Sequence, residues 1–420
     1  MNMTRPWSLI TLLSLILVMS GLLLKNGGLI ALALPYLLFS LIPFWRTAKE
    51  PQLVIVRRFE PRSLLGGQPC HVGVSIQNAG DDLEEVSVSD ALPAGLRVEG
   101  DFKYHGMLRS GQTETIVSTI QGVRGKYEFP GFRVSANDLL GMFRRETFVP
   151  LPATLAVLPA IERLESLKIS PRRTRVYAGV IRSRRSGAGV EFFGTRAYIP
   201  GDPLRHLNWK AGARWDLLIT NLFEQERAAD VGIILDARSI VEARGDRESL
   251  FEHSIRAAAS LADYFLREGN RVGLLIYGRM VEWTYPGYGK QQRARILTAL
   301  AQAELGEHAV FKELERLPTR LFPSDSQIVL VSPLLDKDVF MLNYLHALGY
   351  RVLAVSPDPI AFERRFLPRD EATALAERIG RMERNVTLSK LRRARINVAE
   401  WDVTAPLSIS MKESMRERRR

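Results

Sequence analysis

Short apolar segments that alternate with amphipathic ones constrain the second half of this chain more than any other feature. The apolar segments are five to seven residues long and lie at 231–235, 271–277, 327–331 and 351–355. A strand covered on both faces is apolar at almost every position, so we expect buried parallel strands there. Helical periodicity follows them, at 246–269, 291–305, 336–348 and 369–382. This alternation predicts an open, mostly parallel sheet flanked by helices over residues 229–404.

Residues 51–150 show a different pattern, in which strand-like segments are separated by turns. The segments are rich in β-branched residues with partial two-residue alternation and lie at 53–59, 71–77, 85–88 and 113–120. Glycine- and proline-containing turns interrupt them, at 66–67, 79–80 and 93–95. Short strands at this spacing predict an antiparallel β-sandwich.

The chain begins with two uncharged, mostly apolar runs, at 7–24 and 27–45. About 20 helical residues at 1.5 Å each cross the hydrocarbon layer of a membrane. We therefore expect a transmembrane hairpin over residues 1–50, with a cleaved signal peptide or a pair of buried core helices as the alternatives. Arg5 precedes the first run, and Arg46 and Lys49 follow the second. The positive-inside rule then predicts a multi-pass inner-membrane protein whose bulk is cytoplasmic.

Cysteine usage and charge limit the compartment and the partners. Cys70 is the single cysteine and cannot form an internal disulfide, which favours a reducing compartment. The net charge of +12 suggests an anionic partner, and lipid headgroups, nucleic acid or an acidic protein would each serve. The basic tail at 405–420 has no interleaved aromatic residues, and no nucleic-acid motif is found. We therefore expect the bilayer and a protein as partners, and no nucleic acid.

A tight turn at Pro200-Gly201 gathers charge in the region 151–228, which the sequence otherwise predicts to be a linker. Proline presets φ and glycine supplies a positive φ, so this dipeptide is a turn signal. Four cations crowd around the turn beside one indole and one carboxylate. The candidate binding residues are Arg196, Tyr198, Pro200, Gly201, Asp202, Arg205, Trp209, Lys210 and Arg214.

The order of these residues resembles the signature of the bacterial domain of unknown function family 58. The match runs from Gly189 to Arg214 as Gly-x-Glu-Phe-x-x-x-Arg-x-Tyr-x-Pro-Gly-Asp-x-x-Arg-x-apolar-x-Trp-Lys-x-x-Ala-Arg. The resemblance implies a membrane protein with a von Willebrand factor A-like domain after the signature. It also implies a MoxR-type AAA+ ATPase as a partner, because members are often encoded beside one. It implies no reaction.

The resemblance to von Willebrand A domains raises the question of a metal site. Those domains often hold a divalent cation through Asp-x-Ser-x-Ser after the first strand. Here the motif reads Asp236-Ala237-Arg238-Ser239-Ile240, so only the aspartate of that motif is present. A guanidinium opposes Mg²⁺ by charge, and Mg²⁺ needs oxygen ligands in octahedral geometry. We therefore expect a degenerate site at Asp236, Arg238 and Ser239 that holds no metal, with Arg238 paired to Asp236 in its place.

Catalytic motifs are not found. The glycines from Gly189 to Gly194 are not followed by the lysine of a phosphate loop. The six histidines show no metal-ligand spacing, and there is no Gly-x-Ser-x-Gly motif. We expect no catalytic residue and no cofactor, with a cell-envelope enzyme at the inner membrane face as the alternative.

Two interpretations of the charged turn remain open. In the first, Asp202, Glu191, Glu224 and Glu226 pair with the cations, and Trp209 fills a core pocket. In the second, part of the cluster stays unpaired and docks an acidic surface of a partner, where arginine and tryptophan are frequent hot spots. The resulting hypothesis is a membrane-anchored scaffold or adaptor that binds a MoxR-type ATPase in assembly, maturation or stress functions.

Overall fold

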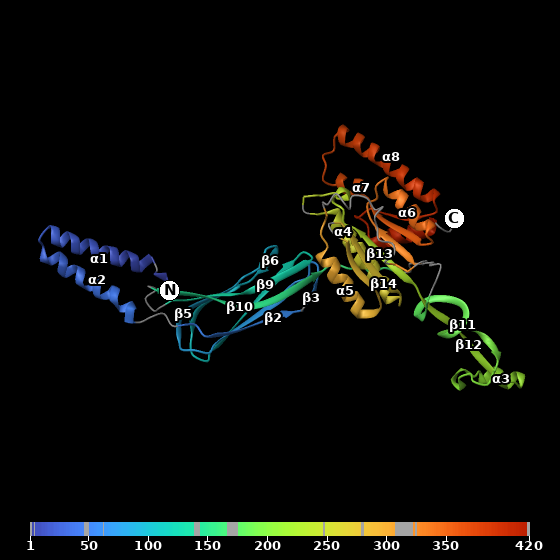
Figure 1. Cartoon of the computed structure of the whole chain (residues 1–420), viewed down its shortest axis with the longest axis horizontal. Helices are drawn as coiled ribbons and strands as arrows, with labels where there is room; N and C mark the ends of the chain where they lie inside the picture. Colours follow the sequence, from blue (N-terminus) through green and yellow to red (C-terminus); the bar gives the residue numbers. More distant parts are fainter. Residues whose placement is uncertain are drawn as a thin grey trace. The chain divides into compact units, whose positions relative to one another are not determined.

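The fold is given by a computed structural model of the chain (Figure 1). The structure describes residues 2–3, 5–45, 50–61, 63–137, 143–165, 175–246, 248–278, 281–306, 322–323 and 326–417. Within these ranges it describes no side chains at 5–6, 41–45, 63, 143, 175–191, 224–227 and 415–417. The chain forms two compact units, Met1–Leu158 and Pro159–Arg420.

The first unit contains a helix pair and the strands of two sheets. The helices are α1 (Arg5–Leu23) and α2 (Gly27–Trp45). The strands are β1 (Asn2–Met3), β2 (Leu53–Glu60), β3 (Ser63–Leu65), β4 (Cys70–Asn78), β5 (Leu83–Asp90), β6 (Leu96–Glu99), β7 (Lys103–Leu108), β8 (Thr113–Gly122), β9 (Gly125–Asn137) and β10 (Phe143–Leu158).

Two sheets of this unit share one hydrophobic core. One sheet has the order β1-β10-β9-β5-β7 with β3 beside β10, and the other has the order β2-β4-β8-β6. All their pairings are antiparallel except that of β3 with β10. Val74 and Ile76 of β4 and Phe129 and Val134 of β9 meet in the core. The alternation of buried and exposed residues along β4 matches a sheet with one covered face.

Helices α1 and α2 correct the membrane prediction. In the described part of the chain, no helix combines the length and the apolar character that a membrane crossing needs. The predicted transmembrane hairpin at 1–50, with spans at 7–24 and 27–45, is therefore wrong, and so is the predicted inner-membrane location. The Trp7 indole of α1 donates to the carbonyl oxygen of Ser40 in α2, at 3.3 Å. An apolar run shows which side chains avoid water, but it does not show whether lipid or a neighbouring helix covers them. Arg46 and Lys49 lie outside the described residues.

The second unit contains a two-stranded ribbon and a six-stranded sheet. Its strands are β11 (Arg175–Ala197), β12 (Ile219–Ala228), β13 (Asp230–Asp236), β14 (Arg271–Tyr277), β15 (Val281–Gly287), β16 (Gln327–Val331), β17 (Arg351–Pro357) and β18 (Asn397–Trp401). Its helices are η1 (Leu204–His206), α3 (Trp209–Trp215), η2 (Ser239–Val241), α4 (Leu250–Arg267), α5 (Gly289–Gln302), α6 (Asp338–Ala347), α7 (Pro359–Arg364), α8 (Glu371–Arg393) and α9 (Leu407–Glu417).

The six-stranded sheet has the order β15-β14-β13-β16-β17-β18, and only β15 runs antiparallel to its neighbour. Ile234 and Leu330 of its central strands share a core with Leu342 of α6 and with Leu388 and Leu391 of α8. This packing places α6 and α8 on one face of the sheet. The carboxyl ends of β13 and β16 lie side by side, because the two strands are parallel neighbours in register.

The ribbon pairs β11 with β12 in antiparallel fashion and carries η1 and α3 between its strands (Figure 1). Together with the two sheets of the first unit, this ribbon places a large part of the described chain in antiparallel strand pairs. The predicted fold class, a transmembrane hairpin followed by a β-sandwich and a von Willebrand A-like sheet, is therefore wrong. The structure supports the coarser description of a mixed α/β protein. Strand-like periodicity does not specify a strand's neighbours, which depend on long-range pairing.

Candidate functional site

The candidate binding residues lie at one end of the β11–β12 ribbon, in residues 196–219, which we call the signature tip. Asp202 organises its turn. Its carboxylate accepts from Arg196 at 2.7 Å, from the backbone N–H of Ile199 at 3.1 Å and from the Thr220 hydroxyl at 3.3 Å. The Ile199 N–H, together with Arg196 and Thr220, lowers the pKa of Asp202. Gly201 has φ of 108°, so the predicted Pro200-Gly201 turn is confirmed.

The chain after the turn is tied back to the ribbon by backbone hydrogen bonds. The N–H of Tyr198 donates to the carbonyl of Leu218 at 2.8 Å, and the N–H of Asn208 donates to that of Ile219 at 2.7 Å. Asn208 then caps α3, because its Oδ1 accepts from the N–H of Ala211 at 2.9 Å. Helix α3 ends at Trp215 and is followed by Asp216, whose φ of 49° is left-handed.

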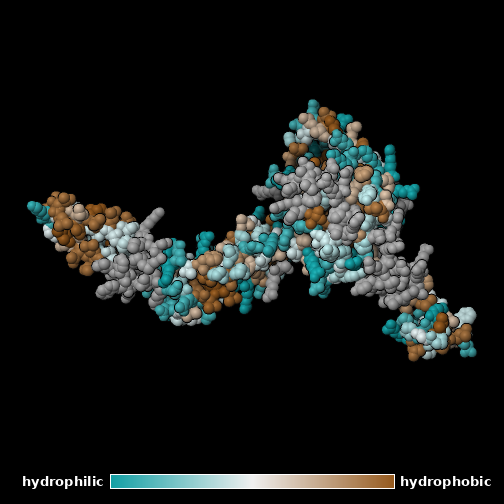
Figure 2. Space-filling view, viewed as in Figure 1, coloured by the Kyte–Doolittle hydropathy of each residue, from teal (hydrophilic) through white to brown (hydrophobic). Residues whose placement is uncertain are grey.

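Apolar side chains are exposed along this tip. The large ones are Ile199, Leu204, Trp209, Trp215, Leu217 and Leu218, of which Trp209 is 69% and Leu217 is 64% exposed. The interpretation in which Trp209 fills a core pocket is therefore wrong. Figure 2 shows hydrophobic and hydrophilic residues interleaved over the end of the ribbon that carries α3.

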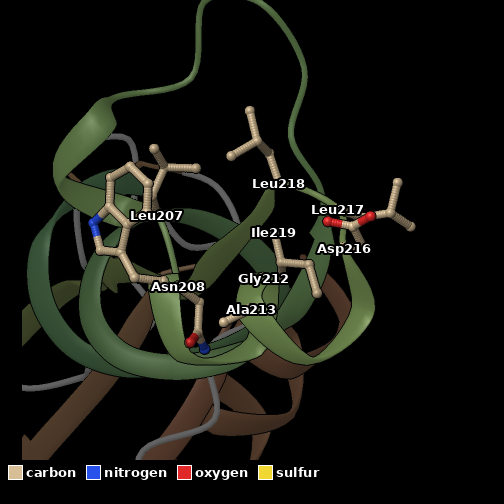
Figure 3. A pocket seen from close by; sticks show the side chains of 9 residues that line it. Leu207, Asn208, Gly212, Ala213, Asp216, Leu217, Leu218 and Ile219 are labelled. Atoms are coloured by element: carbon tan, nitrogen blue, oxygen red, sulfur yellow. The ribbon is translucent and has the colours of Figure 1, made fainter.

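A concave surface of about 390 Å³ lies between α3 and the start of β12. Figure 3 shows Leu207, Leu218 and Ile219 around it, with Gly212 and Ala213 of α3 below. Gly212 keeps α3 close to the returning chain, because a Cβ at this position would lie 3.0 Å from the carbonyl oxygen of Leu217. The lining residues are Leu207, Asn208, Trp209, Gly212, Ala213, Asp216, Leu217, Leu218 and Ile219.

The four cations of the tip divide into two groups. Arg196 pairs with Asp202, as the first interpretation of the turn expected. Arg205, Lys210 and Arg214 are exposed, and no described carboxylate pairs with them. Arg205 donates to Nε2 of His206 at 3.3 Å, which requires that nitrogen to be an acceptor. The side chains of Glu191, Glu224 and Glu226 lie outside the described residues.

A second constellation lies at the carboxyl end of β13. Arg238 donates to both oxygens of Asp236, at 2.8 and 2.6 Å, and to both oxygens of Asp338, at 3.1 and 2.9 Å. The Ser332 hydroxyl donates to Asp236 at 2.7 Å, whereas Ser239 begins η2. All three charged side chains are almost completely buried. The guanidinium therefore lies between the two carboxylates, in the position that a bound cation would need. The expected pairing of Arg238 with Asp236 is present.

Burial and neighbouring charges shift the pKa values of Arg238 and Asp338 in opposite directions. Burial tends to lower the pKa of Arg238, but hydrogen bonds and charges from Asp236 and Asp338 outweigh it and raise that pKa. Burial raises the pKa of Asp338, and Arg238 opposes the shift. Among the described residues, no group of three His, Cys, Asp or Glu side chains is close enough to hold a metal ion.

Sequence reasoning missed Asp338 and the exposed leucines of the tip. Asp338 is the first residue of α6, six positions beyond Ser332. An acidic residue at the start of the helix after β16 is the signal that could have found it. Leu217 and Leu218 come directly before β12, which begins at Ile219.

Comparison with known proteins places the signature tip and much of the second unit in one family. A family model described as "Protein of unknown function DUF58" matches residues 194–386. A relative from Bacillus subtilis (strain 168), "Uncharacterized protein YeaD", is 28% identical over 159 residues, which are 37% of this chain. The chain spans 37% of the length of that curated relative.

Similarity to solved structures is low. A crystallised part of Escherichia coli alpha-2-macroglobulin is 18% identical, with a TM-score of 0.23, over 27% of this chain and 17% of that one. A FixG-related protein from Vibrio parahaemolyticus is 11% identical, with a TM-score of 0.18, over 26% of this chain and 98% of that one. At these scores neither similarity carries an argument about function.

Proposed function

We infer that this chain, which belongs to the DUF58 family, is a protein-binding scaffold whose signature tip docks an acidic surface of a partner. The observation that carries the proposal is the arrangement of Arg205, Lys210 and Arg214. These three exposed cations have no carboxylate partner among the described residues, and they lie on the signature tip together with exposed apolar side chains. We propose a MoxR-type AAA+ ATPase as the partner, in an assembly, maturation or stress function.

The apolar part of the tip supports docking of a protein. Trp209, Leu217 and Leu218 would lose water contact in a complex, and burial of such side chains drives association. Tryptophan and arginine are enriched among interface residues with large energetic effects. The concave surface beside α3 would accept an apolar side chain of the partner.

Charge supports an acidic partner. Residues 196–219 contain four cations and two carboxylates, and one of those carboxylates, Asp202, is already paired with Arg196. The tip therefore carries an excess of positive charge that complementary carboxylates would match. Such charges speed association and set specificity, and salt weakens their effect.

The decisive experiment measures binding of the purified full chain to the purified ATPase encoded by the same genome. The charge-reversed variant Arg205→Glu/Lys210→Glu/Arg214→Glu should bind at least about tenfold more weakly than the wild type. The matched control Lys290→Glu/Arg295→Glu/Arg369→Glu changes net charge equally, at exposed residues of the second unit outside the signature tip. It should bind like the wild type.

Three outcomes would reject the proposal. The first is that the ATPase fails to bind the wild-type chain at micromolar concentration. The second is that the tip variant binds as tightly as the wild type, and the third is that the control loses as much affinity as the tip variant. Trp209→Ala adds a test of the apolar component. It should also lose about tenfold, whereas Phe340→Ala, which removes an exposed aromatic residue from α6, should not.

A further inference from the structure

Helix α8 has apolar residues on two opposite faces. One face packs into the second unit, where Leu388 and Leu391 lie in the core with Leu342 of α6. The other face exposes four large apolar side chains to solvent. They are Leu375 (57% exposed), Ile379 (50%), Met382 (68%) and Val386 (53%). Figure 2 shows hydrophobic residues among hydrophilic ones in the region where Figure 1 places α8.

The spacing of the exposed residues is that of a coiled-coil seam. Successive members are four, three and four residues apart, which is the spacing of the a and d positions of a heptad repeat. At about 100° per residue, all four lie within one narrow stripe, and Leu388 and Leu391 lie on the far side of the helix. A second helix can therefore reach the stripe without meeting the rest of the second unit.

We propose that α8 pairs with α8 of a second copy of this chain, as a short parallel coiled coil about a two-fold axis. In this register Ile379 and Val386 occupy a positions, and Leu375 and Met382 occupy d positions. β-Branched residues at a and leucine at d favour two parallel strands. The pairing is independent of the signature tip and goes beyond the scaffold function proposed for it.

The charges beside the stripe fit the same arrangement. In the parallel register, Arg378 at position g faces Glu383 at position e of the second copy, and the symmetry repeats the contact. Both side chains are exposed, and neither has an oppositely charged partner among the described residues. An antiparallel arrangement would bring g positions together, which in α8 are Glu371, Arg378, Asn385 and Arg392. Arg378 would then face Asn385 and not a carboxylate, and Arg392, which would face Glu371, is already paired with Glu400. The charge pattern therefore selects the parallel orientation and a second copy as the occupant.

Site-specific disulfides in the full chain test both pairing and orientation. The native Cys70 is buried, which keeps background oxidation low. Leu375→Cys and Val386→Cys, each alone, should form covalent dimers under mild oxidation, because like residues meet in a parallel pair. Ala374→Cys, exposed on another face of α8, is the control and should stay monomeric. Absence of both crosslinks would overturn the proposal, and so would a crosslink formed only when Leu375→Cys and Val386→Cys are mixed, which indicates antiparallel packing.

Sedimentation over a range of concentrations measures the pairing without a crosslink. Arg378→Glu places two carboxylates together in each of the symmetric contacts and should raise the dimer dissociation constant about tenfold. Arg378→Glu/Glu383→Arg exchanges the charges and should restore the wild-type value. An unchanged constant in the single variant, no recovery in the double variant, or a wild-type chain that stays monomeric would each overturn the proposal. The last result would assign the stripe to a helix of a different protein.

Discussion

Arg238 holds Asp338, a residue one hundred positions further along the chain, through two hydrogen bonds of 3.1 and 2.9 Å. The same guanidinium donates to both carboxylate oxygens of Asp236 at the end of β13, so one side chain joins this strand to the start of α6. All three groups are almost completely buried. Because two buried carboxylates depend on one cation, the stability of the second unit depends on Arg238.

Replacing Arg238 by methionine should destabilise the second unit by about 3–5 kcal/mol, because it leaves two buried carboxylates without a counter-charge. Urea unfolding of the full chain, followed by the fluorescence of its tryptophans, measures the loss. Arg392→Met is the matched control. Its ion pair with Glu400 is half exposed on both sides, so the expected loss is about 0.2–1 kcal/mol. Equal losses in the two variants would contradict the buried role of Arg238.

His253 should make the second unit less stable at mildly acidic pH. Burial, and then the positive charge of Arg256, lower the pKa of His253 below 6.5, while Glu248 opposes the shift and Arg365 adds to it. The unfolded chain therefore takes up the proton first, so stability is lost as pH falls below 6.5 towards the folded pKa. Unfolding free energies measured from pH 8 to pH 5 should fall less steeply in His253→Gln. If the unfolding free energies of the wild type and of His253→Gln fall equally with pH, His253 is not the group that causes the loss of stability.

Gly131 in β9 should not tolerate a side chain. Its φ is 151°, and a Cβ there would lie 2.3 Å from the carbonyl oxygen of Val149 and 2.9 Å from the amide nitrogen of Leu151. Both contacts are with backbone, which cannot rotate away, so Gly131→Ala should cost more than about 1 kcal/mol. Gly73→Ala in β4 is the control, because a Cβ there meets nothing within 4 Å. Thermal unfolding of the first unit compares them, and a stable Gly131→Ala variant would show that the backbone of β10 at Val149 and Leu151 can shift.

Asn208→Ala should loosen α3 and weaken partner binding together. The substitution removes the cap on the Ala211 N–H and the 2.8 Å hydrogen bond to Asn221, at a local cost of about 1 kcal/mol. Hydrogen exchange of the α3 amides should quicken about fivefold. Asn208→Asp retains an oxygen for the cap and should keep most of the protection. If both variants exchange like the wild type, the cap does not hold α3 in place.

Several features of this chain were readable from short stretches of sequence. The turn at Pro200-Gly201 and the strand at 231–235, observed as β13 (Asp230–Asp236), depend on conformational preferences and on a local run of apolar residues. The order of residues from Gly189 to Arg214 identified the family, since the matched region begins at residue 194 within it. Each of these inferences needed only residues near one another in the chain.

Other features were decided only when distant segments packed together. The sequence places Asp338 a hundred residues from Arg238, and only the parallel pairing of β13 with β16 brings the two side chains into contact. Trp209 and the four residues of the α8 stripe have large apolar side chains of the kind found in a protein core, yet in the structure they are exposed. The apolar runs at 7–24 and 27–45 were likewise misread as membrane spans. Composition and spacing determine local conformation, whereas the burial of each apolar side chain, and the surface that covers it, depend on the packing of the whole chain.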